Sequence, residues 1–415
     1  MADSAGATLK ADPRRKLIVC CDGTWNKPFS VDSPPTNVVK MVRAIRPVDD
    51  NGISQLVYYH AGVGTNNWYD SIMGGAMGVG LSGNVQSCYD FLATNFVDGD
   101  LIFLFGFSRG AFTARSLAGL IGYIGLLEKR DMDLFPYVYD IYSSVEFRQV
   151  LSGGDRTEMQ SALHKLFPKV VAEKTLDRLL EALLRARPAP IFFIGVWDTV
   201  GALGVPVGML SWIGRSKYQF HDTDLSDRIS YAYHALAIDE ARGNFKPTLW
   251  TRPANRDPHK RPQTLEQVWF AGAHSNVGGG YPDCGLSDTA FLWMVAKAAA
   301  AAQAENSDSP LAIDQQYLKE KIDRSIGLLV DSRKKIFRYL PAYRRPIMAA
   351  PAPGKETCEA IHRSVQLRYQ CGDGSQFAPF PYRPDNLKVA MDAKPAIATI
   401  MTLERSFRPE PNATA

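Results

Sequence analysis

Three residues of the types used in nucleophilic catalysis, Ser108, Asp198 and His274, each follow an apolar segment. The segments have the composition of buried strands and are Leu101–Phe105, Pro190–Val196 and Glu266–Ala271. A serine hydroxyl is a poor nucleophile until a base takes its proton, and imidazole, with a pKa of about 6.5, can do so. A carboxylate can then hold the imidazole in the required tautomer. Since the carboxyl ends of parallel strands share one edge of a sheet, we expect these three side chains to meet there.

The serine lies in the pentapeptide Gly106-Phe107-Ser108-Arg109-Gly110, between an apolar run and small residues at helical spacing. Strand, tight turn and helix are the context that a G-x-S-x-G nucleophile elbow requires. The glycines would let strand and helix approach closely while the serine sits in a strained turn. The alternative is a glycine-rich turn with an incidental serine. The order serine, aspartate, histidine is that of the α/β-hydrolase triad and favours the elbow.

Other residues compete for the base and its carboxylate partner. The remaining histidines are His60, His164, His221, His234, His259 and His362. His164 and His362 lie in polar segments expected to be exposed, and His234 falls in a predicted helix over Arg228–Ile238. His274 could instead hydrogen-bond its glycine turn, and Asp198 could merely cap a turn. Among later acidic residues, Asp283 and Asp288 follow His274, and Asp288 suits the first turn of the next helix.

An oxyanion site needs backbone N–H groups aimed at the developing negative charge. One should come from Arg109, the residue after the proposed nucleophile. The second is expected from Gly23 or Thr24, in the turn after the apolar run Lys16–Cys21. Asp22 could brace this turn, although a simple Asp-Gly turn explains it equally well.

The elements needed to position these residues alternate along the first half of the chain. In order, we expect a strand, helix, strand, helix, strand and helix over Lys16–Cys21, 36–45, Gln55–Tyr59, Asn84–Phe96, Leu101–Phe105 and the residues after Ser108. This order predicts an α/β fold with a mostly parallel sheet and helices on both faces. The glycine-rich segment 62–83 contains no lysine and no phosphate-loop motif, which favours a substrate-site or packing loop over nucleotide binding.

The alternation breaks over about 126–190, where helical patterns follow one another without a strand. We expect an inserted cap or a small helical subdomain there. The predicted organisation is a disordered leader over 1–15, an α/β core over 16–305 that contains this insert, and a C-terminal extension over 306–415 packed on the core.

Composition narrows the class of protein. The 415 residues are 46% hydrophobic and 22% charged, with a net charge of +4 and dispersed basic residues, so no nucleic-acid face is expected. Six scattered cysteines without a C-x-x-C pair predict no metal site, and we expect no cofactor. The first residues lack a secretory apolar region and no run is long enough to span a membrane. We therefore expect a cytoplasmic protein, with export without a cleavable signal as the alternative.

Five motifs in order, CDGTWN, GVGT, GFSRGAFTAR, GVWDTVGALG and HSNVGGGY, resemble an uncharacterised α/β-hydrolase-like domain family. That family is related to the phospholipase effectors of type VI secretion systems. The resemblance covers roughly residues 16–300. It implies an α/β-hydrolase core with a Ser108–Asp198–His274 triad and, in the secreted relatives, lipase or phospholipase activity.

The leading hypothesis is a serine hydrolase that cleaves a carboxylic ester, of the esterase, lipase or phospholipase type, through an acyl-enzyme. The residues expected to contact the ester or lipid are Asp22, Trp25, Gly64, Thr65 and Trp212. The apolar stretch Val205–Ile213 could touch acyl chains or a membrane surface, or simply pack as a lid. The alternatives are a non-catalytic binding or scaffold module on the same fold, and a thioesterase or peptidase. The sequence leaves the oligomeric state open.

Overall fold

The structure is a computed structural model of the whole chain. It describes residues 14–23, 34–62, 77–144, 147–148, 150, 154–167, 172–200, 223–255, 257, 260, 262–305, 311–323, 327–333, 341–371 and 382–407.

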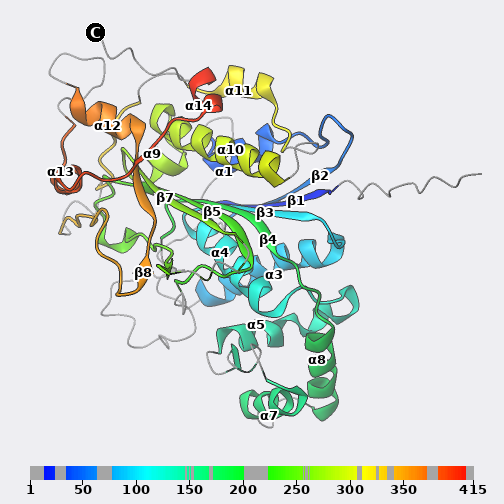
Figure 1. Cartoon of the computed structure of the whole chain (residues 1–415). Helices are drawn as coiled ribbons and strands as arrows, with labels where there is room; N and C mark the ends of the chain where they lie inside the picture. Colours follow the sequence, from blue (N-terminus) through cyan, green and yellow to red (C-terminus); the bar gives the residue numbers. More distant parts are fainter. Residues whose placement is uncertain are drawn as a thin grey trace, which may run out of the picture.

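An eight-stranded sheet crosses the middle of the molecule, and every strand pair in it is parallel (Figure 1). Its strands are β1 (Lys16–Cys21), β2 (Gln55–His60), β3 (Leu101–Phe107), β4 (Ile191–Trp197), β5 (Ile229–Ala237), β7 (Thr264–Phe270), β9 (Glu359–His362) and β10 (Ile397–Ala398). The spatial order is β2-β1-β3-β4-β5-β7-β9-β10. The chain turns from β2 back across β1 to β3, so the crevice at the carboxyl ends of β1 and β3 is the switch point where α/β proteins bind ligands.

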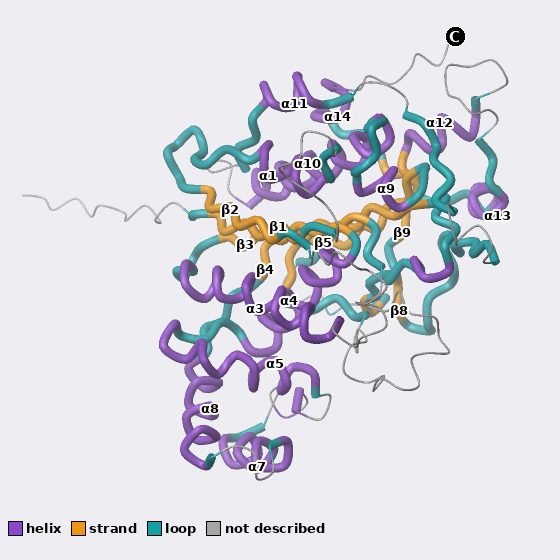
Figure 2. The backbone as a smooth tube through the Cα atoms, turned by 180° about the vertical axis from the view of Figure 1, so that it is seen from behind, coloured by secondary structure: helices purple, strands orange, loops and turns teal. Residues whose placement is uncertain are grey.

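Helices cover both faces of the sheet, which confirms the predicted fold class (Figure 2). The two layers contain α1 (Asn37–Ala44), α10 (Gly285–Glu305) and α11 (Gln315–Lys321) on one face, and α3 (Met77–Asn95) and α4 (Arg109–Ile124) on the other. Strand β1 is buried on both sides: Leu17 and Val19 pack with α3 and α4, whereas Ile18 and Cys20 pack with α1 and α10. This two-sided burial explains why its sequence is an unbroken apolar run.

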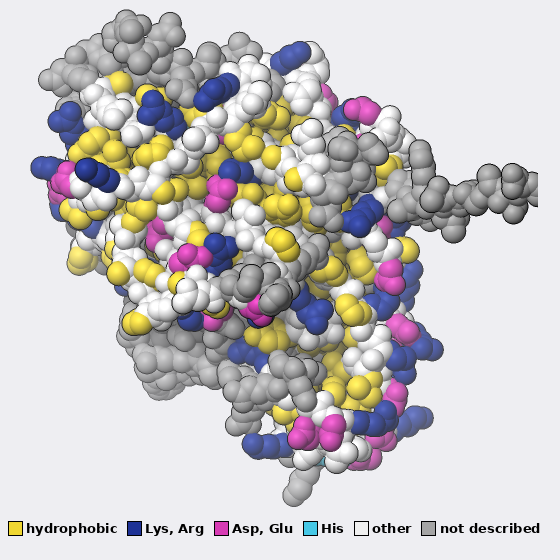
Figure 3. Space-filling view, viewed as in Figure 1, with side chains coloured by type: hydrophobic (Ala, Val, Ile, Leu, Met, Phe, Trp, Pro, Cys, Tyr) yellow, Lys and Arg dark blue, Asp and Glu magenta, His cyan; other side chains and the backbone are white. Residues whose placement is uncertain are grey.

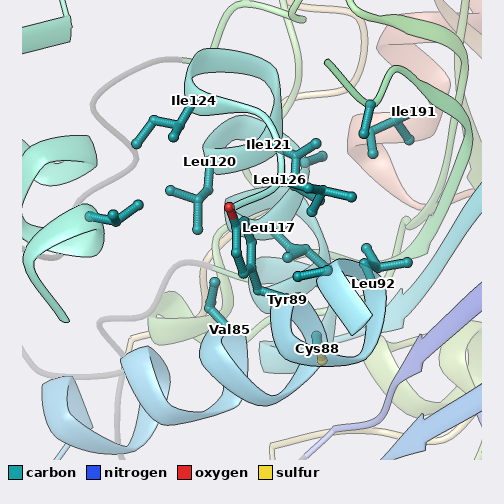
Figure 4. Close-up of a cluster of buried hydrophobic side chains, with 14 of the residues drawn as sticks. Val85, Cys88, Tyr89, Leu92, Leu117, Leu120, Ile121, Ile124, Leu126 and Ile191 are labelled. Carbon is teal, nitrogen blue, oxygen red and sulfur yellow. The ribbon is translucent and has the colours of Figure 1, made fainter. Parts of the chain in front are cut away.

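The layer under the sheet is built from facing apolar stripes of α3 and α4 (Figure 4). Val85, Cys88 and Leu92 of α3 meet Leu117 and Ile121 of α4, and all are fully buried or nearly so. The buried Tyr89 hydroxyl donates to the carbonyl of Gly125 at 2.8 Å, so its polar end is satisfied where α4 ends. Helix α4, which begins beside Ser108, is thereby fixed along its length.

The predicted insert contains η1 (Lys129–Leu134), α5 (Phe135–Ser143), α7 (Arg156–Leu166) and α8 (Glu173–Arg185). It leaves the sheet after α4 and returns beside it, because Leu126 and Arg187 exchange backbone hydrogen bonds of 2.8 Å. The Arg187 guanidinium also donates to carbonyls at the end of α3, near the amino ends of the strands. The insert therefore starts from the edge opposite Ser108, as a helical subdomain rather than a cap. Side chains of both charges cover α7 and α8 in Figure 3, among them the Arg156–Glu181 and Arg185–Glu181 ion pairs.

The prediction of a helix over Arg228–Ile238 is wrong, because these residues form the central strand β5. The run Ile-Ser-Tyr-Ala-Tyr-His-Ala-Leu-Ala contains few polar residues, so its apolar positions fit a helix stripe as readily as a doubly buried strand. The neighbouring strands β4 and β7 pair with β5 along its length, and this pairing makes the segment a strand rather than a helix.

The last part of the chain contributes to the sheet itself, since β9 pairs with β7 and β10 pairs with β9. Its other elements are β8 (Lys355–Glu356), which pairs with β6 (Arg252–Pro253), and the helices α12 (Arg363–Gln370), α13 (Asp385–Asp392) and α14 (Thr402–Phe407). Ile361, Val365 and Leu387 of this segment form a buried cluster with Leu236 and Trp269. The segment is therefore continuous with the core through both hydrogen bonds and side-chain packing.

None of the helices in the described ranges has the length and apolar character needed to cross a bilayer.

Candidate active site

Ser108 occupies a strained turn between β3 and α4. Its backbone has φ 58° and ψ −122°, a conformation that non-glycine residues rarely adopt. Its N–H donates to the carbonyl of Trp197 at 3.1 Å, which joins the turn to the end of β4. The neighbouring strand and helix thus hold the serine in a conformation that it would not adopt alone, and they place it at the carboxyl edge of the sheet.

The two glycines of the pentapeptide are required by close backbone packing. A Cβ atom added at Gly110 would lie 2.1 Å from the carbonyl oxygen of Cys21, and one at Gly106 would lie 2.6 Å from the carbonyl oxygen of Gly110. Both contacts are with backbone, which cannot easily move aside. The first turn of α4 therefore rests directly on the end of β1, as the elbow interpretation expects.

His274 and Asp198 are joined by a short hydrogen bond beside this turn. Nδ1 of His274 lies 2.6 Å from Oδ2 of Asp198. The imidazole ring contacts the ring of Phe107, the residue before Ser108, with 4.7 Å between the centroids, and it meets Phe245 edge-on at 5.0 Å. The helix α9 (His274–Gly278) begins at His274, directly after β7. The sequence-predicted pair therefore lies next to the elbow, with one ring nitrogen held by the carboxylate.

The backbone of Asp198 is also strained, with φ 39°, in the turn after β4. The side chain is fully buried, and Oδ1 accepts a hydrogen bond from the N–H of Ala237 at 3.0 Å. The strained turn places the carboxylate between the ends of β5 and β7. The carboxylate has two side-chain partners there, and His274 is the first of them.

The second partner of Asp198 is Arg345, a residue that sequence analysis did not single out. Its Nη1 lies 2.6 Å from Oδ1 and its Nη2 lies 3.0 Å from Oδ2, so the pair is bidentate. Both side chains are 0% exposed. Burial alone would raise the pKa of Asp198, but the charge of Arg345 and the hydrogen bonds from His274 and Arg345 outweigh it and hold the pKa well below its ordinary value. Asp198 is therefore ionised at neutral pH.

Glu240 supports the histidine from the backbone side. The N–H of His274 donates to its Oε2 at 3.2 Å, and the hydroxyl of Ser332 donates to Oε1 at 2.8 Å. Arg242 pairs with the same carboxylate at 2.8 Å. Burial opposes ionisation of Glu240, but Arg242 and, less strongly, His274 lower its pKa below the ordinary range. The start of α9 is thus fixed by a charged and fully bonded side chain.

His234, which lies in β5 rather than in a helix, is close to Asp198 but cannot act as a base. Its Nε2 accepts from the N–H of Thr199 at 3.1 Å and its Nδ1 lies 3.2 Å from Oε1 of Gln267. Burial, followed by the charge of Arg115, lowers its pKa to about 3. Both ring nitrogens are committed to holding the turn after β4, so the role of His234 is structural.

The turn after β1 is braced by Asp22, as one of the two sequence interpretations proposed. The buried carboxylate accepts from the hydroxyls of Thr36, at 2.9 and 3.0 Å, and Tyr59, at 2.9 Å. It also accepts from the N–H of Gly23 at 2.7 Å. That N–H is turned toward Asp22, and Thr24, the alternative second donor, lies outside the described residues. The other predicted donor, Arg109, is the first residue of α4.

Several residues predicted to act at the site lie outside the described residues: the predicted oxyanion donor Thr24, the predicted substrate contacts Trp25, Gly64, Thr65 and Trp212, and the rival histidines His221 and His259. Of the other rivals, Asp288 lies in the first turn of α10 as expected and pairs with Lys40. The expectation that His362 is exposed is wrong, because it is buried between Phe270 and Glu404 at the end of β9, a strand that the sequence did not reveal. Within the described ranges, no group of metal-ligating side chains is assembled.

A family model described as "T6SS, Phospholipase effector Tle1-like, catalytic domain" matches residues 15–297. The uncharacterized protein YEL023C of Saccharomyces cerevisiae is 29% identical over 251 residues, which cover 57% of this chain and 33% of that protein. The chain thus spans about a third of that relative's length.

Two solved structures are similar, each with a TM-score of 0.32. One is the Tle1 effector bound to the VgrG spike of the type 6 secretion system, at 18% identity over 66% of this chain and 53% of that chain. The other is an uncharacterized protein from Pseudomonas aeruginosa, at 15% identity over 73% of this chain and 47% of that chain.

Proposed function

The chain belongs to the family of Tle1-like phospholipase effector catalytic domains, and from this membership we propose that it hydrolyses an acyl ester of a phospholipid or related lipid. In this proposal Ser108 is the nucleophile, His274 the base and then the acid, and Asp198 the residue that orients His274. The reaction proceeds through an acyl-enzyme.

The observation that carries the proposal is the 2.6 Å bond between His274 and Asp198 beside a strained serine. The ionised carboxylate fixes the proton of the imidazole on Nδ1, which leaves Nε2 to accept a proton from a hydroxyl. Contact between the rings of His274 and Phe107 puts the imidazole one residue from Ser108. Strain at the serine supports the same interpretation, because such backbone conformations cluster at functional sites.

The steps follow from these roles. Oγ of Ser108 attacks the ester carbonyl carbon while its proton passes to Nε2 of His274. The N–H groups of Arg109 and of the turn after β1 stabilise the oxyanion. The carbon–oxygen bond then breaks, the alcohol leaves with the proton from His274, and the acyl group stays on Ser108. Water, deprotonated by His274, attacks the acyl-enzyme and releases a carboxylic acid and free serine.

The lipid nature of the substrate rests on the family membership and on the apolar sequence Val205–Ile213, which lies outside the described residues. Co-sedimentation with vesicles of mixed phosphatidylcholine and anionic phospholipid tests membrane contact. We expect the wild type to bind and a variant with Leu210→Ala and Trp212→Ala to bind less. Absence of binding by both proteins would argue against contact with a membrane surface.

The nucleophile is tested by labelling with a fluorophosphonate probe and by release of fatty acid from phospholipid vesicles and from p-nitrophenyl esters of increasing chain length. We expect the wild type to be labelled at Ser108 and Ser108→Ala to lose about 10⁶-fold in kcat, as serine hydrolases do when the nucleophile is removed. Ser116→Ala, two turns along the same helix, is the matched control and should retain labelling. A wild type that is never labelled would favour a non-catalytic binding module, and activity retained in Ser108→Ala would exclude the assignment.

A further inference from the structure

We propose that Arg345 is a positioning residue of this site: its guanidinium fixes the orientation of Asp198 and supplies the counter-charge of this buried carboxylate. The proposal rests on the proposed function. Arg345 lies in the C-terminal part of the chain, beyond residue 297, where the family match ends. Among the described residues its guanidinium bonds Asp198, Ala237 and Phe245, so it would act on the site through Asp198.

The geometry of the guanidinium supports positioning. Nη1 bonds both Oδ1 of Asp198 and the carbonyl of Ala237, at 2.6 and 2.8 Å. Nη2 bonds Oδ2 of Asp198 and the carbonyl of Phe245, at 3.0 and 2.6 Å. A planar group with four bonds in fixed directions allows the carboxylate one orientation. That orientation directs Oδ2 at Nδ1 of His274.

The same contacts tie together the surroundings of the imidazole. The carbonyl of Phe245 accepts from Arg345, and its ring meets the ring of His274 at 5.0 Å. Ala237, at the end of β5, gives its N–H to Asp198 and its carbonyl to Arg345. Removal of the guanidinium would therefore release two of the groups that surround the His274–Asp198 pair.

The charge of Arg345 has a separate effect. A buried carboxylate without a counter-charge takes up a proton more readily than one beside a cation. Arg345 balances the charge of Asp198 and keeps the carboxylate ionised despite its burial. Asp198 therefore remains an acceptor for the imidazole of His274 at lower pH than it would without Arg345.

The other charged and titratable groups that face this pair do not substitute for Arg345. Glu240 faces the backbone of His274 but is neutralised by Arg242. His234 of β5 is kept neutral by burial and by the charge of Arg115, and both side chains contact Trp250. Among the described residues, the cation in direct contact with Asp198 is Arg345.

The test compares wild type, Arg345→Gln and Arg345→Lys by the second-order rate of fluorophosphonate labelling between pH 4.5 and 9. For Arg345→Gln we expect the acidic limb of the profile to move up by about one pH unit, because Asp198 takes up a proton more readily without the charge of Arg345. Arg345→Lys keeps the charge but loses the planar fork. Its limb should stay near that of the wild type while its plateau rate falls about tenfold.

The outcomes separate the two proposals. A wild type without labelling at Ser108 contradicts the proposed function itself. A labelled wild type whose Arg345→Gln variant has an unshifted limb contradicts the role of Arg345, even if the rate falls equally at every pH, since a merely structural loss would do that. If Arg345→Gln does not fold, Arg345→Lys decides the matter, and a plateau rate equal to that of the wild type would overturn the positioning role.

Discussion

Two aspartates in this molecule are both buried and paired with a cation, but their proposed roles differ. Asp198 and Asp288 are both 0% exposed, and each bonds a buried cation from a distant part of the chain, Arg345 and Lys40, at 2.6 and 2.5 Å. Each also accepts a backbone N–H, from Ala237 and Asp323 respectively. The difference is the third group, because only Asp198 also holds an imidazole.

This difference shows that burial and ion pairing alone do not identify a functional carboxylate. The Lys40–Asp288 pair joins α1 to α10 on one face of the sheet. The Asp198–Arg345 pair uses the same kind of interaction to hold an imidazole beside a serine. In this molecule, a buried charged pair indicates a candidate site only where it also positions another reactive side chain.

The largest expected effect is a loss of catalytic turnover when Asp198 is replaced. Asp198→Asn should lower the rate of Ser108 labelling and of ester hydrolysis by about 10⁴-fold, since the amide does not hold the imidazole in the required tautomer. Asp288→Asn is the matched control and should keep its activity per folded molecule. Both rates should be normalised to the folded fraction measured by circular dichroism. Equal losses of activity in the two variants would remove the distinction between the two carboxylates.

The next effect is on stability and should be shared by both pairs. Asp288→Asn leaves Lys40 buried without its counter-charge and should lower the free energy of unfolding by about 3–5 kcal/mol. The double variant Lys40→Met with Asp288→Leu should recover this loss, because a buried ion pair can be replaced by apolar groups at little net cost. Urea titrations of the three proteins measure the difference. A double variant as unstable as Asp288→Asn would mean that the pair has a role beyond charge balance.

The smallest expected effect is on the pH dependence of stability and comes from His234, the buried histidine of β5. His234 has its pKa lowered to about 3, against about 6.5 in an unfolded chain, so the unfolded state binds the proton first. The stability that neutral His234 contributes is fully present above about pH 6.5 and is lost as the pH falls below that value. Between pH 7 and pH 5 the wild type should lose about 2 kcal/mol of unfolding free energy through this residue.

The matched variant His234→Gln retains an acceptor for the N–H of Thr199 and does not titrate. Urea titrations at pH 7 and pH 5 should therefore show a smaller decrease for the variant than for the wild type. The same decrease in both proteins would mean that His234 is not the source. Labelling of Ser108 should persist in His234→Gln, which distinguishes this supporting histidine from His274.

The positions of the three candidate catalytic residues could be predicted because local sequence specifies them. Ser108, Asp198 and His274 each follow an apolar run, and the structure places all three at strand ends on one edge. Glycines at 106 and 110 mark the close approach of backbone that the elbow needs. Strong strands bounded by turn residues are the elements that pattern alone identifies.

The remaining features could not be predicted because their signals are not local. The strand β5 has apolar residues on both faces, which removes the alternation that would distinguish it from a helix. The strands β9 and β10 are only 4 and 2 residues long, and β9 pairs with the distant β7 while β10 pairs with β9. Arg345 lies in a proline-containing loop, 147 residues from its partner Asp198. No short-range pattern links those two positions.

That separation has a consequence for how the site comes into existence. A chain made from its N-terminus contains Ser108, Asp198 and His274 before it contains Arg345. Closing a loop of this length is also costly in entropy, which places the contact late in folding. Until Arg345 arrives, Asp198 would have to remain hydrated or take up a proton, because a buried carboxylate without a partner is unstable. We therefore expect newly made chains to reach full activity only after the segment that carries Arg345 has docked.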